Sequence, residues 1–326
     1  MSEVYFSKEL NEKYLKVLEE NIKQKFNGCK KIAVKLHFGE KGNKTAFIPE
    51  DIKPFTDILK ENGFEYFLFD SSTSYEGVRD NPKTHKEHAV EKGFDELGPI
   101  VTDDSFILVN GKHMDYEVCK PLVDSDAVLV ISHFKGHDCS GFGGAIKNLG
   151  MGALTKKTKQ EIHEGGKPEI LDNCNACKAC EKACNWGFLK IVNNKHVFLD
   201  CYGCSNCIIK CPNKAMKPKV ALFDSLLADG ANAARSQFKK DYYINVAKKI
   251  TKICDCAINS KEVIAEDTGY FAGEDPVAVD KACYDAISKQ EGKDVFLKFN
   301  QKSGLRQVKA AEKLGMGNPE YQLVKA

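Results

Sequence analysis

Hydrophobic positions in the first 132 residues follow two different periods. Apolar side chains three and four apart predict an amphipathic helix from residue 7 to residue 26, which Gly28 ends. Short apolar runs predict strands at 31–38, 65–70, 105–109 and 127–132, and helices that begin at prolines are expected at 49–63 and 82–92. This alternation of strands and helices indicates an α/β fold, a mostly parallel sheet covered on both faces to give three layers.

The same alternation returns towards the C-terminus. It predicts helices at 220–238 and 305–314 and strands at 242–253, 263–271 and 321–324. Asp275 and Pro276 are the N-cap and first-turn residues of a further helix that runs to about residue 289. Because α/β elements stand on both sides of it, residues 168–220 are expected to be a domain inserted into one discontinuous α/β domain, 1–167 and 221–326.

Cysteine spacing indicates what the insertion carries. Eight of the chain's 14 cysteines form two copies of the run Cys-x2-Cys-x2-Cys-x3-Cys, and Pro212 follows the second copy only. This run is typical of an α+β ferredoxin domain with two clusters, in which the fourth cysteine of each copy ligates the other cluster. The expected 4Fe–4S ligand sets are Cys174, Cys177, Cys180 and Cys211, and Cys201, Cys204, Cys207 and Cys184. Two zinc ribbons, the structural alternative, would need CxxC pairs far apart in the sequence.

The composition of the chain limits the classes of protein to which it can belong. Hydrophobic content of 42% and charged content of 29% are those of a soluble globular chain, and no apolar stretch approaches 18 residues. Since the N-terminus also lacks a signal-like pattern, we expect a cytoplasmic protein with no membrane partner, in a cell that tolerates iron–sulfur chemistry, typically an anaerobic one. A net charge of +2 gives no sign of nucleic-acid binding.

The insertion is formally +4, and two clusters would bring it near neutrality, which favours an internal electron relay over a free carrier.

Polar residues gather where the predicted strands end. They are Lys35, His37, Asp70, His133, Lys135 and His137, and Lys147 follows in a glycine-rich stretch. Ligands bind at such strand ends in α/β folds, so lysines there would hold an anion and histidines would move protons. Within the glycine-rich stretch, Gly141, Gly143, Gly144 and Asn148 are candidates for close backbone contact with a ligand. The structural alternative is a tight glycine turn with solvated or core histidines.

A further pair of cysteines lies outside the insertion. Cys254 and Cys256 are two residues apart, a spacing that suits chelation of one soft metal or a redox-active thiol pair. Cys283 or a histidine (His37, His133 or His137) could complete a metal site. Ordinary buried thiols are the alternative, and we expect Cys29, Cys119 and Cys139 to be of that kind.

Together these segments resemble the family called domain of unknown function 362, whose members often carry an inserted two-cluster ferredoxin. The resemblance rests on 35–40 (KLHFGE), 74–79 (SYEGVR), 133–152 with its HFKGH and GFGGAIKNLGMG runs, the CDC at 254–256 and DPVAVD at 275–280. It spans nearly the whole chain and departs from the family pattern at Asp138-Cys139 and at the missing proline after Cys184. It implies an architecture and no particular reaction.

Three functions compete at this point. The first is an oxidoreductase in which two 4Fe–4S clusters pass low-potential electrons from a partner protein or other donor to a small-molecule substrate. Its site would comprise the Lys, His and Asp residues named above with Cys254 and Cys256. The others are a non-catalytic electron carrier, and a metal or cluster assembly protein that uses a third metal site at Cys254 and Cys256. No nucleotide fingerprint is present, although a bound flavin remains compatible with the sequence.

Overall fold

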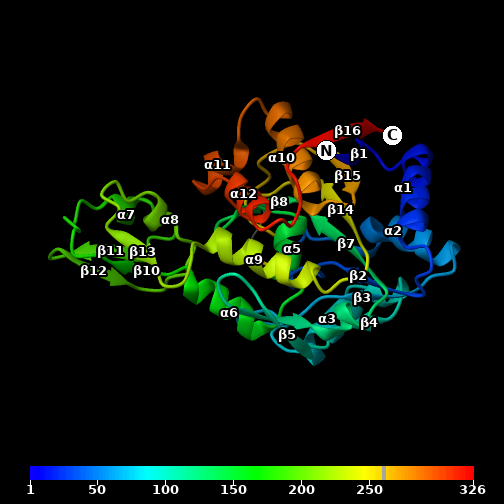
Figure 1. Ribbon diagram of the computed structural model, residues 1–326, viewed down its shortest axis with the longest axis horizontal. Helices are drawn as coiled ribbons and strands as arrows, with labels where there is room; N and C mark the ends of the chain where they lie inside the picture. The colour runs from blue at the N-terminus through cyan, green and yellow to red at the C-terminus, as the bar shows by residue number, and fades with distance from the viewer. Residues whose placement is uncertain (259–261) are drawn as a thin grey trace.

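An eight-stranded sheet forms the centre of the larger of two lobes in the computed structural model, which describes residues 1–258 and 262–326 (Figure 1). In spatial order its strands are β16 (Tyr321–Lys325), β1 (Ser2–Ser7), β15 (Gly269–Gly273), β14 (Asp241–Ala247), β7 (Ala127–His133), β2 (Lys31–Lys35), β3 (Glu65–Phe69) and β4 (Ile100–Val101). Neighbouring strands are parallel except beside β15, which runs antiparallel to β1 and β14. The predicted α/β fold with a mostly parallel sheet is therefore confirmed.

Two apolar clusters, one on each face of the sheet, hold the helices in place. Along β7, Val128 and Val130 belong to one cluster and Leu129 and Ile131 to the other, as strand alternation requires. One face is covered by α1 (Glu12–Lys25), α2 (Pro49–Glu61), α3 (Pro82–Glu91) and the turn η1 (Phe94–Glu96). The other is covered by α4 (Lys120–Val123), α5 (Ala145–Gly150), α6 (Lys156–Gly165), α9 (Phe223–Arg235), α10 (Pro276–Gln290), α11 (Val295–Asn300) and α12 (Leu305–Lys313).

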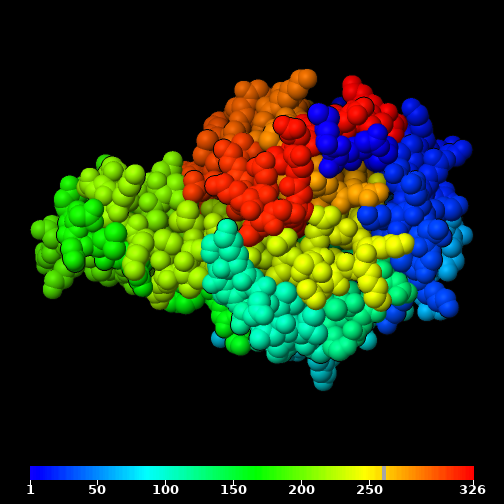
Figure 2. All heavy atoms as spheres, in the orientation of Figure 1, coloured from blue at the N-terminus to red at the C-terminus, as the bar shows by residue number. Residues whose placement is uncertain are grey.

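The cysteine-rich segment forms a narrow lobe that projects from the α/β lobe (Figures 1 and 2). Its elements are β10 (Pro168–Ile170), α7 (Ala179–Lys182), β11 (Leu189–Val192), β12 (Lys195–Phe198), α8 (Asn206–Ile209) and β13 (Met216–Pro218). Strand β10 pairs with β13 and β11 with β12. The buried core of this lobe consists of Cys180, Leu189, Ile191, Cys207 and Met216. So few apolar side chains make a marginal core, which suits a lobe that is stabilised by bound metal.

Several predicted elements have different bounds in the structure. The first helix begins at Glu12, because Asn11 caps it and residues 2–7 form β1 instead. The strand expected at 242–253 ends at Ala247, after which Lys249 adopts a left-handed backbone, and the one expected at 263–271 is paired in the sheet only from Gly269.

Two short hairpins lie outside the central sheet. They are β5 (Phe106–Asn110) with β6 (Asp115–Cys119), and β8 (Lys135–His137) with β9 (Gly141–Gly143). The first contains the strand predicted at 105–109, and the second carries part of the glycine-rich stretch. No helix in the described ranges has the length and apolar character that crossing a membrane requires.

Candidate functional site

A cavity of about 130 Å³ lies where β2, β3 and β7 end. Of the predicted site residues, it is lined by His37, Asp70, His137, Lys147, Asn148 and Cys256. A second cavity of about 50 Å³ shares three of these, His37, Lys147 and Asn148, and is also lined by His133, Gly143, Gly144 and Cys254. The polar strand ends thus converge, whereas Lys35 and Lys135 are buried and line neither of the two cavities.

The carboxylate of Asp255 anchors the turn that carries the two cysteines. It accepts hydrogen bonds from Lys135 Nζ at 2.5 Å and His133 Nδ1 at 2.7 Å. Burial would raise the pKa of Asp255, but the charges of His133 and Lys135 outweigh it and hold this pKa well below its usual range. The backbone oxygen of Asp255 also accepts the N–H of Glu40 at 2.9 Å. His133 and Lys135, predicted as catalytic, are therefore in contact with the residue that positions the cysteines.

His133 is held by contacts at both of its ring nitrogens. Its Nε2 lies 2.8 Å from the carbonyl oxygen of Lys248 while Nδ1 faces the Asp255 carboxylate, so both nitrogens have acceptors. The ring also stacks on Phe47 with centroids 4.3 Å apart. With one face and both nitrogens engaged, His133 is held in one orientation.

Lys35 is also a supporting residue, buried beneath the larger cavity. Its Nζ donates to Asp70 Oδ1 at 3.0 Å, to Asn148 Oδ1 at 2.8 Å and to the carbonyl of Leu36 at 2.6 Å. Burial would raise the pKa of Asp70, but Lys35 and the nearby histidines and Arg79 hold it well below its usual range. Lys35 thus fixes the end of β3 to α5 through a buried, fully engaged ammonium group.

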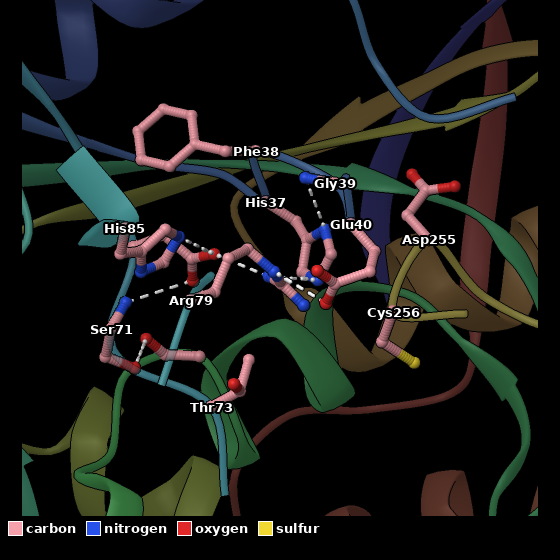
Figure 3. A network of polar contacts seen from close by, with 12 residues as sticks. His37, Phe38, Gly39, Glu40, Ser71, Thr73, Arg79, His85, Asp255 and Cys256 are labelled. Carbon is pink, nitrogen blue, oxygen red and sulfur yellow. Dashed lines mark hydrogen bonds and ion pairs between the residues drawn. The ribbon is translucent and has the colours of Figure 1, made fainter. Parts of the chain in front are cut away.

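An arginine that sequence reasoning did not select connects the strand ends (Figure 3). Arg79 donates from Nη1 to His37 Nε2 at 2.9 Å, from Nη2 to Tyr75 Oη at 2.5 Å and from Nε to Glu40 Oε2 at 3.3 Å. The other nitrogen of His37, Nδ1, lies 3.0 Å from the backbone nitrogen of Gly39. Burial, and then the charge of Arg79, lower the pKa of His37 well below its usual range. His37 is therefore a neutral ring that accepts from Arg79 at Nε2 and orients it.

Cys254 and Cys256 lie between the two cavities and are joined as a disulfide, with their Cα atoms 5.4 Å apart. A ring nitrogen of His137 and the two sulfur atoms all lie within 4.8 Å of one another. Lys147 Nζ is 3.8 Å from Cys254 Sγ. The three donors His137, Cys254 and Cys256 have the spacing of a soft-metal site, while the bonded sulfurs have the form of a redox pair. Cys283 is buried on α10 and is not part of this group.

Two lysines on the cavity wall lack a carboxylate partner that would balance their positive charge. Lys147 and Lys159 both line the larger cavity, and within the described residues neither has a carboxylate oxygen within 4.0 Å. Lys159 instead donates to the hydroxyl of Ser71 at 2.7 Å and to backbone oxygens. Burial lowers the pKa of each lysine to about 8. A buried cation gains most from an anionic ligand, so this wall favours an anion.

The glycine-rich stretch serves packing more than ligand contact. The N–H groups of Ala145 and Ile146 donate to the buried carboxylate of Asp280 at 2.6 and 3.0 Å, and a Cβ on Gly144 would lie 2.3 Å from that carboxylate. Gly141, which has a φ of +82°, packs against the backbone of Gly304. The amides at the start of α5 are therefore already used. Asp280, at the end of the DPVAVD signature, is the residue that uses them.

The eight thiols of the narrow lobe fall into two electrostatic groups. The pKa of the Cys204 thiol is raised by burial and, among neighbouring charges, by Cys201 and Cys184. The pKa of Cys180 is raised by burial and then by Cys174 and Cys177. Cys211 and Cys184 both pack against the core that contains Cys180 and Cys207. Cys184 thus lies with the second run of cysteines and not with its own, the grouping that crossed ligation needs.

Spacing also distinguishes clusters from zinc. Tetrahedral zinc with bonds of about 2.3 Å would hold its thiolates about 3.8 Å apart. In the described part of the chain no three of these eight thiols lie within 4.8 Å of one another. Wider spacing suits a multi-iron cluster, whose irons separate the sulfurs, so the donor set fits two 4Fe–4S clusters better than zinc.

One of the two cysteine groups lies against the wall of the larger cavity. The carbonyl of Cys204 accepts Lys302 Nζ at 2.6 Å, and Lys302 forms a buried ion pair with Asp224 of α9 at 2.9 Å. His163, a lining residue that the sequence analysis missed, has Nδ1 2.7 Å from the carbonyl of Tyr202. The loop that carries Cys201 and Cys204 therefore contacts His163, a side chain of the cavity wall.

Arg79, Lys159 and His163 are the site residues that sequence reasoning missed. Arginine occurs at only three positions in this chain, and Arg79 lies in the 74–79 segment that carried the family resemblance, so a signal existed for it. Lys159 and His163 are on α6, where they follow ordinary helical spacing, and nothing in the sequence separates them from surface residues.

Comparisons with known proteins bear on the family and the fold. A family model described as Domain of unknown function (DUF362) matches residues 32–285, and a comparison with curated proteins found no match. A protein from Thermotoga maritima, whose crystal structure was a structural genomics target, is 12% identical with a TM-score of 0.50, covering 88% of this chain and 60% of that one. The lactate racemase apoprotein from Thermoanaerobacterium thermosaccharolyticum is 15% identical with a TM-score of 0.44, covering 84% and 54%. The chain thus spans about 60% of the length of the Thermotoga protein, and that likeness concerns the fold alone.

Proposed function

Since the chain belongs to the Domain of unknown function (DUF362) family, which brings no reaction with it, we propose from its side-chain chemistry that it is an iron–sulfur oxidoreductase. Residues 168–220 are a ferredoxin-type module inserted between residues 1–167 and 221–326. Cys174, Cys177, Cys180 and Cys211 hold one 4Fe–4S cluster, and Cys201, Cys204, Cys207 and Cys184 hold the second. The bound clusters supply single low-potential electrons to the site in the α/β domain.

The observation that carries this proposal is the contact between the second cysteine group and the cavity. Lys302 connects Cys204 to α9, and His163 contacts Tyr202 while lining the cavity. A free carrier would have no reason to bring one cysteine loop against a buried, charged cavity. The second ligand set is thus the one nearer the substrate.

The cavity favours a small anionic substrate. Its volume of about 130 Å³ is close to that of an engineered cavity of about 150 Å³ that holds benzene, so the substrate is smaller than the three rings of a flavin. Lys147, which is half-buried, and Lys159, which is buried, provide two positive charges that lack carboxylate partners in the described structure. His137 and Cys256 stand on the same wall.

Electrons enter at the other end of the narrow lobe. Cys177, of the first ligand set, is exposed. Hairpin β11–β12 and the residue after it leave Val192, Val197, Phe198 and Leu199 exposed by 53%, 40%, 38% and 68%. Such a patch suits brief docking of an electron-donating partner protein.

The direct test uses full-length protein purified without oxygen. We expect about eight irons per chain, and dye-reduced clusters that reoxidise when a small anionic substrate is added. Cys204→Ser should abolish this reoxidation, while Cys177→Ser, its matched control in the other ligand set, should slow the initial reduction. Zinc in place of iron, or full reoxidation in the Cys204 variant, would contradict the proposal.

A second candidate, metal or cluster assembly, is favoured by the group His137, Cys254 and Cys256. It requires a labile metal atom beyond the eight irons. Elemental analysis of the same preparation, before and after a mild chelator, distinguishes the two functions.

A further inference from the structure

We propose that Cys254 and Cys256 are the reactive couple of this site, a disulfide and dithiol that pass two electrons to the molecule in the cavity. The proposal deepens the function above and depends on it for the source of the electrons. It also selects thiol chemistry over a third metal for these two cysteines.

The position of the two cysteines fits a redox couple that passes electrons between the two cavities. Cys254 lines the smaller cavity and Cys256 the larger one. Asp255, between them, is held by Lys135 and His133, so the turn keeps its place whether the sulfurs are bonded or free. Two cysteines that only ligated a metal would need to face only one of the two cavities.

The tautomer of His137 disfavours a metal. Its Nδ1 accepts the backbone N–H groups of Cys139 at 3.2 Å and Ser140 at 3.3 Å, and the hydrogens of backbone amides cannot turn away. The hydroxyl of Ser140 donates to the carbonyl of Phe142 at 2.7 Å. Nδ1 is therefore unprotonated, and the neutral ring carries its hydrogen on Nε2. A metal on Nε2 would require the opposite tautomer, whereas an Nε2–H group is a hydrogen-bond donor suited to a thiolate.

Lys147 is placed to give a proton to a newly formed thiolate. Its Nζ points at Cys254 Sγ over 3.8 Å and has no carboxylate within 4.0 Å in the described ranges. A lysine ammonium held beside the sulfur in this way is a suitable general acid for a thiolate formed on Cys254.

The step balances with groups already named. The S–S bond takes up two electrons, delivered one at a time by a low-potential one-electron donor, and breaks. Cys254 takes a proton from the Lys147 ammonium and becomes a thiol, while Cys256 is left as a thiolate beside the His137 N–H. Solvent returns the proton to Lys147. Reoxidation by a small anionic two-electron acceptor restores the disulfide.

The test measures the redox state of these two cysteines in full-length protein, independently of turnover. Protein is equilibrated anaerobically in thiol–disulfide buffers of stepped potential, trapped with N-ethylmaleimide in acid and mapped by mass spectrometry. We expect Cys254 and Cys256 to change state together, with the ratio of oxidised to reduced pair changing tenfold per about 30 mV. Independent alkylation at every potential would overturn the proposal, as would a bound metal atom that Cys256→Ser removes.

A matched pair of lysine variants tests the proton donor. Lys147→Gln should slow alkylation of the reduced pair near neutral pH by about tenfold, the effect of raising the thiol pKa by about one unit. Lys252→Gln removes the same charge two residues from Cys254 but from a side chain 36% exposed, and should leave the rate unchanged. Equal rates in the two variants would exclude Lys147 from this role. If iron content and cluster reduction are normal while the pair stays inert, this inference fails and the proposed function survives.

Discussion

The two lobes of this molecule are stabilised in different ways. The α/β lobe buries two large apolar clusters, one on each side of its sheet. The apolar cluster of the narrow lobe has only five buried side chains, and two of these are cysteines. The comparison leads us to expect that the narrow lobe depends on the clusters proposed for it, whereas the α/β lobe would stay folded without them.

Under the proposed function, removal of the iron is the change with the largest expected effect. The narrow lobe should unfold while the α/β lobe persists, because only the former lacks an adequate apolar core. Trp186, the chain's only tryptophan, lies beside Phe188 and Tyr202 in the narrow lobe and also packs against the apolar cluster of the α/β lobe, so it reports on the narrow lobe and on its contact with the α/β lobe. Its fluorescence should change on chelation, whereas far-ultraviolet circular dichroism should lose only a small part of its signal. A loss of both signals together would mean that the lobes are one cooperative unit.

Within the α/β lobe the most damaging single change is expected at Asp255. Asp255→Asn would leave Lys135 and His133 buried without their carboxylate, at a cost of about 3–5 kcal/mol in the free energy of unfolding. Urea unfolding followed by circular dichroism measures this cost. Asp267→Asn, an exposed residue near the same loop, is the control and should change stability by less than about 0.5 kcal/mol. Matching values for the two variants would mean that the buried network contributes little.

Local signals in the sequence were enough to predict much of the fold. Helix α2 begins at Pro49 and α10 begins after the Asp275 cap, as predicted, because capping and proline chemistry act over a few residues. Strand β1 was not predicted. Its six residues are held by pairing with β16 and β15 from the other end of the chain, and no local pattern encodes such pairing.

For the candidate site, too, local signals could be predicted and contacts between distant residues could not. Polar residues at strand ends were predicted to converge, and His37, Asp70 and His137 do line one cavity. Which of these residues line the cavity and which support the cysteines could not be predicted, because these roles depend on contacts between residues distant in sequence. Lys135 and His133 meet Asp255 about 120 residues later in the chain, and that contact makes them supports for the cysteines.

A smaller effect is expected in the cavity when pH changes. Lys147 and Lys159 have pKa values lowered to about 8, so both are largely charged at pH 7 and lose their protons as pH rises through 8. Binding of a small dianion such as sulfate should weaken by about tenfold per lysine between pH 7 and pH 9. Isothermal titration calorimetry measures this slope. Lys159→Gln should make it shallower, while Lys157→Gln, whose side chain is 65% exposed on the same helix, should not.

The smallest expected effect separates the cysteine pair from the clusters. Cys256→Ser should leave iron content and visible absorbance unchanged, because Cys256 is on the α/β lobe and belongs to neither group of thiols in the narrow lobe. Cys207→Ser, a buried cysteine of the second ligand set, should by contrast remove about half of the iron. Iron analysis and absorbance of the two anaerobic preparations make the comparison. Bleaching in the Cys256 variant would show that Cys256 takes part in cluster ligation, and the assignment of all eight ligands would then have to change.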